Sequence, residues 1–320
     1  MPRLRRVQPG RDPGYRRLGS GAGFRYVDAD CDPLPPDERE RAIALVIPPA
    51  WTDVWISAAP NGHIQATGVD EAGRQQYIYH PDWSARRDKG KYARALQLAE
   101  RLPRARARVT ASLRRDDIDR ERVLATAFRL LDQAAPRVGS ERYFTTHGSR
   151  GLTTLLRRDA EVDGTVTSLR FPGKSGKRQS LEVDDADLAA VIELLAAGRP
   201  AAPLLSYRRG RRRVPLTPKD VNVYVRTMTG GRFTAKDFRT LRGTILAADA
   251  LARIGPADTP KDRKRAEVLA VKATAAALGN TPSVAKSSYI DPRVFARYRR
   301  GLLLDIAVSP ESAIRTLLEP

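Results

Sequence analysis

The sequence predicts an α+β fold, with a small β-rich N-terminal domain followed by a mainly α-helical domain that carries a small β-sheet and hairpin. Three observations support this fold class. Between about residues 24 and 83, aromatic or branched residues alternate with polar ones at the strand period, with turn residues between the runs. From Tyr92 onward, Leu and Ala recur at helical spacing, with Arg on the opposite face. At 320 residues, the chain also exceeds one ordinary core.

We place the two domains at residues 1–90 and 91–320, and we expect residues 1–20 to form a flexible basic arm. One short helix is expected in the first domain at PPDERERAIALVI (35–47), opened by prolines and acidic residues and closed by the prolines that follow. The strands of this domain are expected within FRYVDAD (24–30), DVWISAAPNGHIQATGVDEAG (53–73) and QQYIYH (75–80).

The second domain is expected to contain helices separated by few strands. One strand is expected near LTTLL (152–156), and a hairpin carries Lys174. YRRGRRRVP (207–215) is expected to be a basic loop, either a solvated run of charge or a phosphate contact. Helical spacing is found at residues 92–135, 185–198, 217–228, 235–254 and 262–278.

The stretch RFPGKSGKRQS (170–180) ends like a nucleotide-binding P-loop, but its context argues against one. The P-loop pattern requires a glycine five places before Gly173, and Ser168 stands there. A P-loop also leads from a strand into a helix, whereas VTSLRF (166–171) and RQSLEV (178–183) both alternate in the strand period. The glycine-rich segment is therefore the turn of a β-hairpin, which holds Lys174 at the tip of a two-stranded arm.

The charge of the chain points to a polyanionic partner. With 57 Lys and Arg against 37 Asp and Glu, the formal net charge is +20. Nucleic acid is the partner that such a charge predicts. No apolar stretch approaches the roughly 20 residues that span a bilayer, and the basic N-terminus lacks the apolar core of a secretory signal. We expect a cytoplasmic protein.

The residue types that usually bind metals are scarce. Cys31 is the single cysteine, which excludes a disulfide framework and a thiolate cluster. The three histidines, His63, His80 and His147, are too few and too scattered to predict a zinc site. We therefore expect no metal, and any chemistry must come from Arg, Lys, Tyr and amide groups.

Five such residues could act on a phosphodiester. Arg137 lies in RVGSERY, and Lys174 follows it by 37 positions on the hairpin. Arg239 lies inside the helix that contains KDFRTLRGT. Asn280 precedes Tyr289 by nine residues, and Thr281-Pro282 opens a short helix that is expected to end near Tyr289.

In these motifs the chain resembles the type IB DNA topoisomerases in their poxvirus-like and bacterial form, from about residue 20 to 300. The N-terminal segments that resemble the DNA clamp of that family are IPPAWTDVWIS (47–57), NGHIQATG (61–68) and GRQQYIYHPDW (73–83). The motifs RVGSERY, GLTTL, GKSGK, KDFRTLRGT and TPSVAKSSY then follow in family order and with family spacing. Each motif alone is weakly specific, whereas five in order are strongly specific.

The resemblance implies a role for each of the catalytic candidates. Tyr289 would attack a DNA phosphorus and form a 3′-phosphotyrosyl ester, while Arg137 and Arg239 would stabilise the non-bridging oxygens. Lys174 would be the general acid that protonates the departing 5′ oxygen. Guanidinium groups suit the developing charge because they stay protonated and can donate two hydrogen bonds at once.

Asn280 departs from the poxvirus-type pattern, which has histidine at this place. An amide can still donate a hydrogen bond to a non-bridging oxygen, but it cannot carry charge or move a proton. We therefore expect Asn280 to stabilise the transition state only.

The resemblance also implies DNA contacts by Gln76, Tyr77 and Tyr79 in the clamp and by Tyr143 in the second domain. Strand alternation places Tyr77 and Tyr79 on one face, as a DNA-facing surface requires. Half-buried packing of the tyrosines and simple exposure of Gln76 are the alternatives.

The expected activity is relaxation of positive and negative supercoils by transient single-strand cleavage and religation, without ATP, metal or other cofactor. The expected partner is double-stranded DNA, clamped by a monomer in the bacterial nucleoid. Two alternatives stay open. A tyrosine recombinase shares this chemistry, although Lys236 stands where recombinases usually have histidine, and a non-catalytic basic DNA-binding protein would share the charge.

Overall fold

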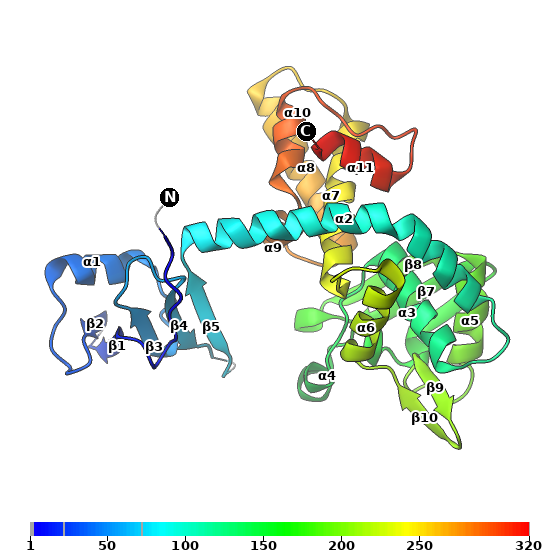
Figure 1. The fold of residues 1–320 in the computed structure, drawn as a ribbon, viewed down its shortest axis with the longest axis horizontal. Coiled ribbons are helices and arrows are strands. Elements are labelled where there is room, and N and C mark those ends of the chain that lie inside the picture. The colour runs from blue at the N-terminus through cyan, green and yellow to red at the C-terminus, as the bar shows by residue number, and fades with distance from the viewer. Residues whose placement is uncertain (1–2, 22, 72, 320) are drawn as a thin grey trace. The chain divides into compact units, whose positions relative to one another are not determined.

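The computed structural model of the chain describes residues 3–21, 23–71 and 73–319, without the side chains of residues 87, 89, 143 and 175. The chain divides into two compact units, Met1–Gly90 and Lys91–Pro320. The first is a sheet with one short helix, and the second is mainly helical with two small sheets (Figure 1). The predicted α+β fold class is confirmed.

The N-terminal unit is built on a five-stranded antiparallel sheet with the strand order β2-β1-β3-β4-β5. Its helix α1 (Pro36–Ala44) lies within the predicted segment and begins with a proline and acidic residues in its first turn. A small apolar core is formed by side chains from α1, β3 and β4, among them Ala42, Val54, Ile56 and Ala66. The strands are β1 (Gly14–Ser20), β2 (Gly23–Val27), β3 (Thr52–Ser57), β4 (Ile64–Val69) and β5 (Gln75–Tyr79).

The prediction of a flexible basic arm at residues 1–20 is wrong for most of the residues that the structure describes there. Residues 14–20 form β1, which pairs with both β2 and β3. Further upstream, the amide of Arg5 donates to the carbonyl of Asn61 at 2.9 Å, and Val7 is buried. Residues 1 and 2 lie outside the described residues. The segment is ordered because the central position of β1 is filled by Arg17, whose guanidinium donates to the carbonyls of Ile47, Pro48 and Trp51.

The second unit contains a helix in each stretch where the sequence predicted one, but the predicted stretch of residues 92–135 is divided into two helices, α2 and α3. Helix α2 also begins at Pro81, before the expected Tyr92 and within the last residues of the first unit. Its core is formed by the apolar faces of these helices, with Phe128 in α3 packed edge-on against Tyr224 and Phe238. The helices are α2 (Pro81–Leu113), α3 (Arg120–Ala134), α4 (Glu141–His147), α5 (Ala186–Ala196), α6 (Pro218–Thr229), α7 (Ala235–Ile254), α8 (Pro260–Leu278), α9 (Pro282–Ser288), α10 (Pro292–Arg299) and α11 (Pro310–Leu318). None of the helices within the described residues is long and apolar enough to cross a membrane.

The larger sheet of this unit confirms the predicted hairpin. Strands β6 (Ala160–Asp163), β7 (Val166–Pro172) and β8 (Arg178–Asp184) are antiparallel, and β7 pairs with β8 up to Pro172 opposite Arg178. The turn between them contains the short 3₁₀ helix η3 (Lys174–Gly176). Lys174 is exposed in this turn, as expected for a side chain presented by a two-stranded arm.

Two local predictions in this unit are wrong. The segment predicted as a strand near residues 152–156 contains the 3₁₀ helix η1 (Leu152–Thr154), and Leu152 and Leu155 are buried. An apolar run that is buried on several sides has no clear period, so a strand and a 3₁₀ turn look alike in sequence. The predicted basic loop at residues 207–215 is a hairpin formed by β9 (Ser206–Arg209) and β10 (Arg212–Pro215). A further 3₁₀ helix, η2 (Arg157–Asp159), leads into β6.

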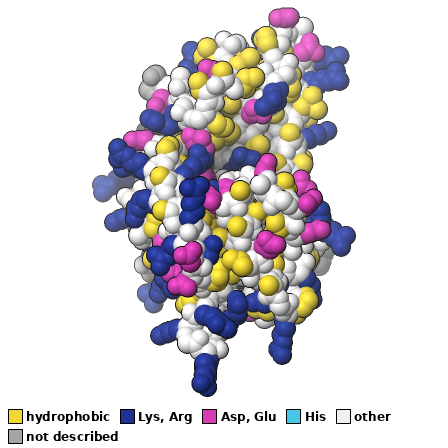
Figure 2. All heavy atoms as spheres, turned by 90° about the vertical axis from the view of Figure 1, so that its right-hand side faces the viewer, with side chains coloured by type: hydrophobic (Ala, Val, Ile, Leu, Met, Phe, Trp, Pro, Cys, Tyr) yellow, Lys and Arg dark blue, Asp and Glu magenta, His cyan; other side chains and the backbone are white. Residues whose placement is uncertain are grey.

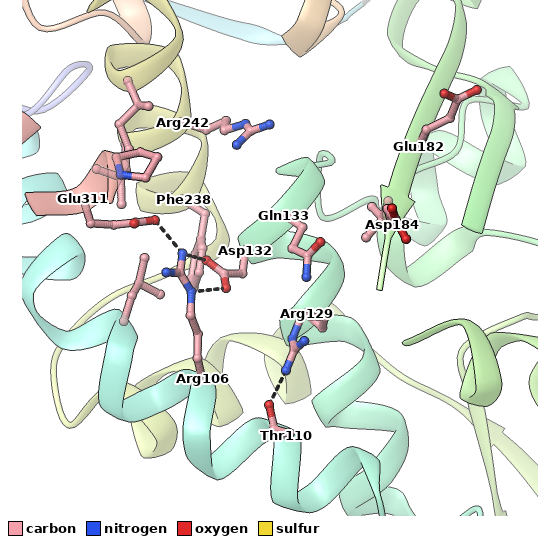
Figure 3. Close-up of a pocket in the computed structure, with 15 residues that line it drawn as sticks. Arg106, Thr110, Arg129, Asp132, Gln133, Glu182, Asp184, Phe238, Arg242 and Glu311 are labelled. Atoms are coloured by element: carbon pink, nitrogen blue, oxygen red, sulfur yellow. Dashed lines mark hydrogen bonds and ion pairs between the residues drawn. The ribbon is translucent and has the colours of Figure 1, made fainter. Parts of the chain in front are cut away.

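A network of ion pairs joins three helices of the second unit. Arg106 of α2 donates to both carboxylate oxygens of Asp132 in α3, at 2.7 and 2.9 Å, and also to Glu311 of α11 (Figure 3). Burial opposes ionisation of Glu311, but the hydrogen bond and charge of Arg106 outweigh it, so the pKa of this carboxyl is lowered. The network fixes α3 and thereby supports the segment that follows it, which begins the candidate site.

Candidate active site

The candidate site is formed where the C-terminal ends of α3, α8 and α9 meet the N-terminal half of α7. Arg239 of α7 is 5% exposed and donates to two backbone carbonyls: Nη1 to Ala135 at 2.6 Å and Nη2 to Leu278 at 2.9 Å. Ala135 caps the C-terminus of α3 and Leu278 ends α8. Helix C-termini carry partial negative charge, which favours a cation at this place.

Arg137 lies in the segment that follows α3. Its Nη2 donates to the carbonyl of Gly279 at 3.1 Å and to Oδ1 of Asn280. The backbone of Arg137 is held by the amide of Leu152, which donates to the Arg137 carbonyl at 2.8 Å. Gly151 must be glycine because a Cβ there would stand 2.6 Å from that carbonyl. The motifs RVGSERY and GLTTL therefore pack directly against each other.

Asn280 accepts from Arg137 through Oδ1, while its buried Nδ2 has no hydrogen-bond partner among the described residues. This orientation is chemically required, because a guanidinium only donates and must face the amide oxygen. The buried Nε of Arg239 likewise has no partner among the described residues. Buried donors are normally satisfied, so both atoms are able to donate to an acceptor that binds in the site.

Tyr289 is the C-terminal cap of α9, as the sequence predicted. Its backbone is held at both ends: its amide donates to Ala285 at 3.0 Å, and its carbonyl accepts from Thr244 Oγ1 at 3.2 Å. Gly243 of α7 allows this approach, since a Cβ there would stand 3.0 Å from that of Tyr289. The guanidinium of Arg239 lies over the phenol ring, with its carbon 4.9 Å from the ring centre.

The electrostatics of the site favour the tyrosinate. Burial raises the pKa of Tyr289, but the charge of Arg239 and the charges of Arg137 and Lys236 outweigh it, so the pKa is lowered. Arg137 experiences the same crowding, because burial and then the nearby charge of Arg239 lower its pKa. A cluster of cations beside a phenol, with no carboxylate within ion-pair distance of Arg137 or Arg239 among the described residues, is suited to receive an anion.

Lys174 is the one candidate whose side chain is not joined to this cluster by a described contact. It is exposed on the turn, yet the preceding Gly173 lines the same narrow cleft as Arg137 and Arg239. The hairpin tip therefore borders the site. Within the described residues, no group of three or more His, Cys, Asp or Glu side chains is arranged to hold a metal ion.

Comparison with known proteins identifies the family to which this site belongs. Residues 80–300 match the catalytic core of eukaryotic DNA topoisomerase I, and residues 23–70 match the N-terminal domain of bacterial DNA topoisomerase IB. The chain is similar to the DNA topoisomerase 1B of Acanthamoeba polyphaga mimivirus, with 30% identity over 285 residues, which cover 87% of this chain and 85% of the viral protein. The chain belongs to the type IB DNA topoisomerases.

The predicted family is thereby confirmed, and with it the class of enzyme: a type I DNA topoisomerase, which is an isomerase that acts on DNA. Among the alternatives left open by the sequence, this result favours the topoisomerase over a tyrosine recombinase or a non-catalytic DNA-binding protein. The roles of individual residues stay predictions.

The predicted DNA-contacting residues are placed as follows. The rings of Tyr77 and Tyr79 stack on one face of β5, with centroids 5.9 Å apart, and Tyr77 is 46% exposed. The amide nitrogen of Gln76 donates to Asp70 at 2.8 Å, which fixes it within the β4–β5 turn region. Tyr143 belongs to α4, and its side chain lies outside the described residues.

Lys236 is a site residue to which sequence analysis assigned no role. It lies one helical turn before Arg239 on α7, is exposed, and its charge contributes to the lowered pKa of Tyr289. The sequence signal that could have indicated this role is its position three residues before Arg239, because residues three apart lie on the same face of a helix.

We predict that Lys236→Ala raises the pKa of Tyr289, because it removes one of the charges that stabilise the tyrosinate, while Arg239 stays in place. The measurement is a pH titration of the protein carrying ¹³Cζ-labelled tyrosine, followed by NMR, with Tyr289→Phe identifying the signal. Arg253→Ala, at the other end of the same helix, is the control and should leave the value unchanged. If the pKa of Tyr289 in the wild type is at or above the ordinary tyrosine pKa of about 10, the nearby cations do not stabilise the tyrosinate.

Proposed function

We propose that the enzyme relaxes positive and negative supercoils by cutting one strand of duplex DNA through Tyr289 and then resealing it. The observation that supports this most is the pair of unsatisfied buried donors, Arg239 Nε and Asn280 Nδ2, in a site where a guanidinium lies over the phenol. A phosphodiester supplies the acceptors that these donors lack, and it is the bond that a DNA topoisomerase must break.

In the proposed cleavage step, Oη of Tyr289 attacks the phosphorus and forms a P–O bond as the bond to the 5′ oxygen breaks. The phenolic proton leaves to solvent, and the lowered pKa of Tyr289 favours its loss. The product is a 3′-phosphotyrosyl ester and a free 5′ hydroxyl. In religation the 5′ oxygen attacks the phosphorus as its proton leaves, and the P–O bond to Oη of Tyr289 breaks, so that the phenol is released and takes up a proton.

Arg137, Arg239 and Asn280 are proposed to stabilise the non-bridging oxygens. Charge on these oxygens grows as the phosphorus becomes five-coordinate, and donors already held in place contribute most at that point. Removing one such donor typically costs about 3–4 kcal/mol of transition-state stabilisation. Asn280 donates through Nδ2 while Oδ1 stays on Arg137, so its amide connects the phosphate to the guanidinium.

Lys174 is proposed to be the general acid. Its ammonium group would give a proton to the 5′ oxygen, which otherwise departs as an alkoxide. The support is its place on the turn directly after Gly173, which lines the cleft beside both arginines.

The reaction as proposed requires neither nucleotide nor metal, because the phosphotyrosyl ester conserves about the free energy of the bond that was broken. While the ester persists, the free 5′ end rotates around the intact strand and releases torsion. A monomer that clamps duplex DNA in the bacterial nucleoid suffices for this, with Gln76, Tyr77, Tyr79 and Tyr143 contacting the duplex.

The β9–β10 hairpin is proposed to bind DNA phosphates, rather than to be only a solvated run of charge. Its register places Arg209 opposite Arg212 and Arg208 opposite Arg213, and like charges on facing positions destabilise a hairpin. None of these arginines has a carboxylate within ion-pair distance among the described residues. Within the second unit the hairpin is the lowest element in Figure 1, and Lys and Arg side chains gather on the lowest part of the surface in Figure 2. Phosphates would relieve the repulsion.

The proposed activity predicts stepwise relaxation of supercoiled plasmid of either sign in EDTA without ATP. Tyr289→Phe should abolish relaxation and the covalent protein–DNA complex, because phenylalanine lacks the attacking oxygen. Gel electrophoresis of topoisomers and denaturing gels of labelled DNA measure the two effects. Relaxation that requires paired specific sites would indicate a recombinase, and an unchanged linking number would indicate an architectural protein.

For Lys174, the prediction concerns the leaving group. Lys174→Ala should cleave ordinary DNA slowly, by roughly 10²–10⁴-fold, but should recover on DNA whose 5′-bridging oxygen is replaced by sulfur, which departs without a proton. Single-turnover rates on the two substrates provide the measurement. If the variant is equally slow on both, Lys174 is not the general acid.

For the β9–β10 hairpin, the double variant Arg209→Gln/Arg212→Gln should bind duplex DNA more weakly and with a shallower dependence of log Kd on log salt concentration. The slope should fall by roughly 0.9 for each phosphate that the hairpin no longer neutralises. The control is Arg253→Gln/Arg315→Gln, which removes the same charge from arginines already paired with Asp249 and Glu319. An identical slope for the hairpin variant and the wild type would show that the hairpin is only solvated.

A further inference from the structure

Gln179 of β8 contacts both the turn that holds Lys174 and the segment that leads to Asn280. Gln179 follows the turn that holds Lys174 and pairs with Phe171 of β7, which precedes that turn. Its side chain is half-buried. Its side chain lines the narrow cleft together with Arg137 and Arg239. The family resemblance and the sequence motifs assigned it no role.

The first contact of Gln179 is with Gly173, the residue before Lys174. A Cβ at Gly173 would stand 2.6 Å from Cγ of Gln179, so the backbone of the turn lies directly on this side chain. The turn is closed by the Gly173 amide, which donates to the carbonyl of Lys177 at 2.8 Å. Gln179 therefore packs against Gly173, the residue that leads directly to Lys174.

The second contact is with Gly279, the residue before Asn280. A Cβ at Gly279 would overlap the amide group of Gln179, and Gly279 has a left-handed φ of +60° at the C-terminal cap of α8. Its carbonyl accepts from Arg137. The segment of residues 278–280 is therefore held by the two arginines and contacted by Gln179.

We propose that Gln179 is a positioning residue that sets the distance between the Lys174 turn and the phosphate-binding groups at residues 278–280. The ladder of β7 and β8 holds the two strands together, but it does not hold their tip against α8. Gln179 does so by packing, with its methylenes on Gly173 and its amide on Gly279. This inference rests on the proposed role of Lys174 in cleavage.

The length of the side chain is the property that matters. The substitution Gln179→Ala would remove the side chain on which Gly173 and Gly279 pack. The turn that holds Lys174 could then shift relative to a phosphate bound in the site. Methionine keeps the unbranched length without the amide. A general acid displaced by about 1 Å can lose on the order of 10²-fold in rate.

The test compares Gln179→Ala and Gln179→Met in single-turnover cleavage of ordinary DNA and of DNA with the 5′-bridging sulfur. Gln179→Ala should slow cleavage of ordinary DNA by roughly 10- to 100-fold and should approach the wild-type rate on the sulfur substrate. Gln179→Met should recover most of the loss. The control is Ser180→Ala, an exposed neighbour that points to the other face of β8, which should match wild type on both substrates.

A second readout does not depend on catalysis. Hydrogen exchange of the free protein should show faster exchange of the amides in the turn of residues 173–177 for Gln179→Ala, but not for Ser180→Ala. Unchanged exchange, or equal slowing on both DNA substrates, would overturn the positioning role. By contrast, failure of sulfur to rescue Lys174→Ala would count against the proposed general acid, whatever Gln179→Ala does in the exchange measurement.

Discussion

The buried guanidinium of Arg239 is the interaction on which the site depends. It donates to the carbonyls of Ala135 and Leu278, at 2.6 and 2.9 Å. Those carbonyls lie at the C-terminal ends of two helices, two residues before Arg137 and Asn280 respectively. One cation therefore draws two chain segments together, and each delivers one of the proposed phosphate-binding groups. The same cation lies over the ring of Tyr289 and favours its ionised form.

The repulsion between the two arginines shows what the site lacks. Burial and the charge of Arg239 lower the pKa of Arg137, so the charged pair is destabilised when nothing negative lies between them. Backbone carbonyls and the Asn280 amide oxygen supply only partial charge. A phosphate would supply full charge and would also occupy the two unsatisfied donors. In the proposed mechanism, the cost of holding the cations together in the free enzyme would be converted into preference for the five-coordinate transition state.

The identity of Asn280 follows from the same geometry. The guanidinium of Arg137 offers only donors, so residue 280 presents an acceptor to it, and in the proposed mechanism it also presents a donor to the phosphate. An amide does both at once and does not change with pH. In the proposed mechanism, asparagine in place of histidine would therefore supply both an acceptor and a donor without a titratable group.

Much of this fold could be predicted from the sequence because helical periodicity and the alternating hairpin strands reflect local burial. The strand at residues 14–20 was missed for a physical reason. Its inward-facing residue is Arg17, whose charge is satisfied by loop carbonyls, whereas a hydrophobicity pattern treats arginine as exposed. The β9–β10 hairpin was missed because facing arginines disfavour pairing. The contact of Gln179 with Gly279 joins residues far apart in the chain, and no local pattern encodes it.

The most direct test of the proposed site is a crystal structure of the enzyme on nicked duplex DNA with vanadate in place of the cleaved phosphate. Vanadate adopts the five-coordinate geometry, so it shows which groups surround the transition state. We expect Oη of Tyr289 at one apex and Lys174 Nζ within about 3 Å of the opposite oxygen. Arg137, Arg239 and Asn280 Nδ2 should contact the equatorial oxygens. A complex in which Asn280 Nδ2 and the Arg239 guanidinium contact no vanadate oxygen would contradict the proposed site.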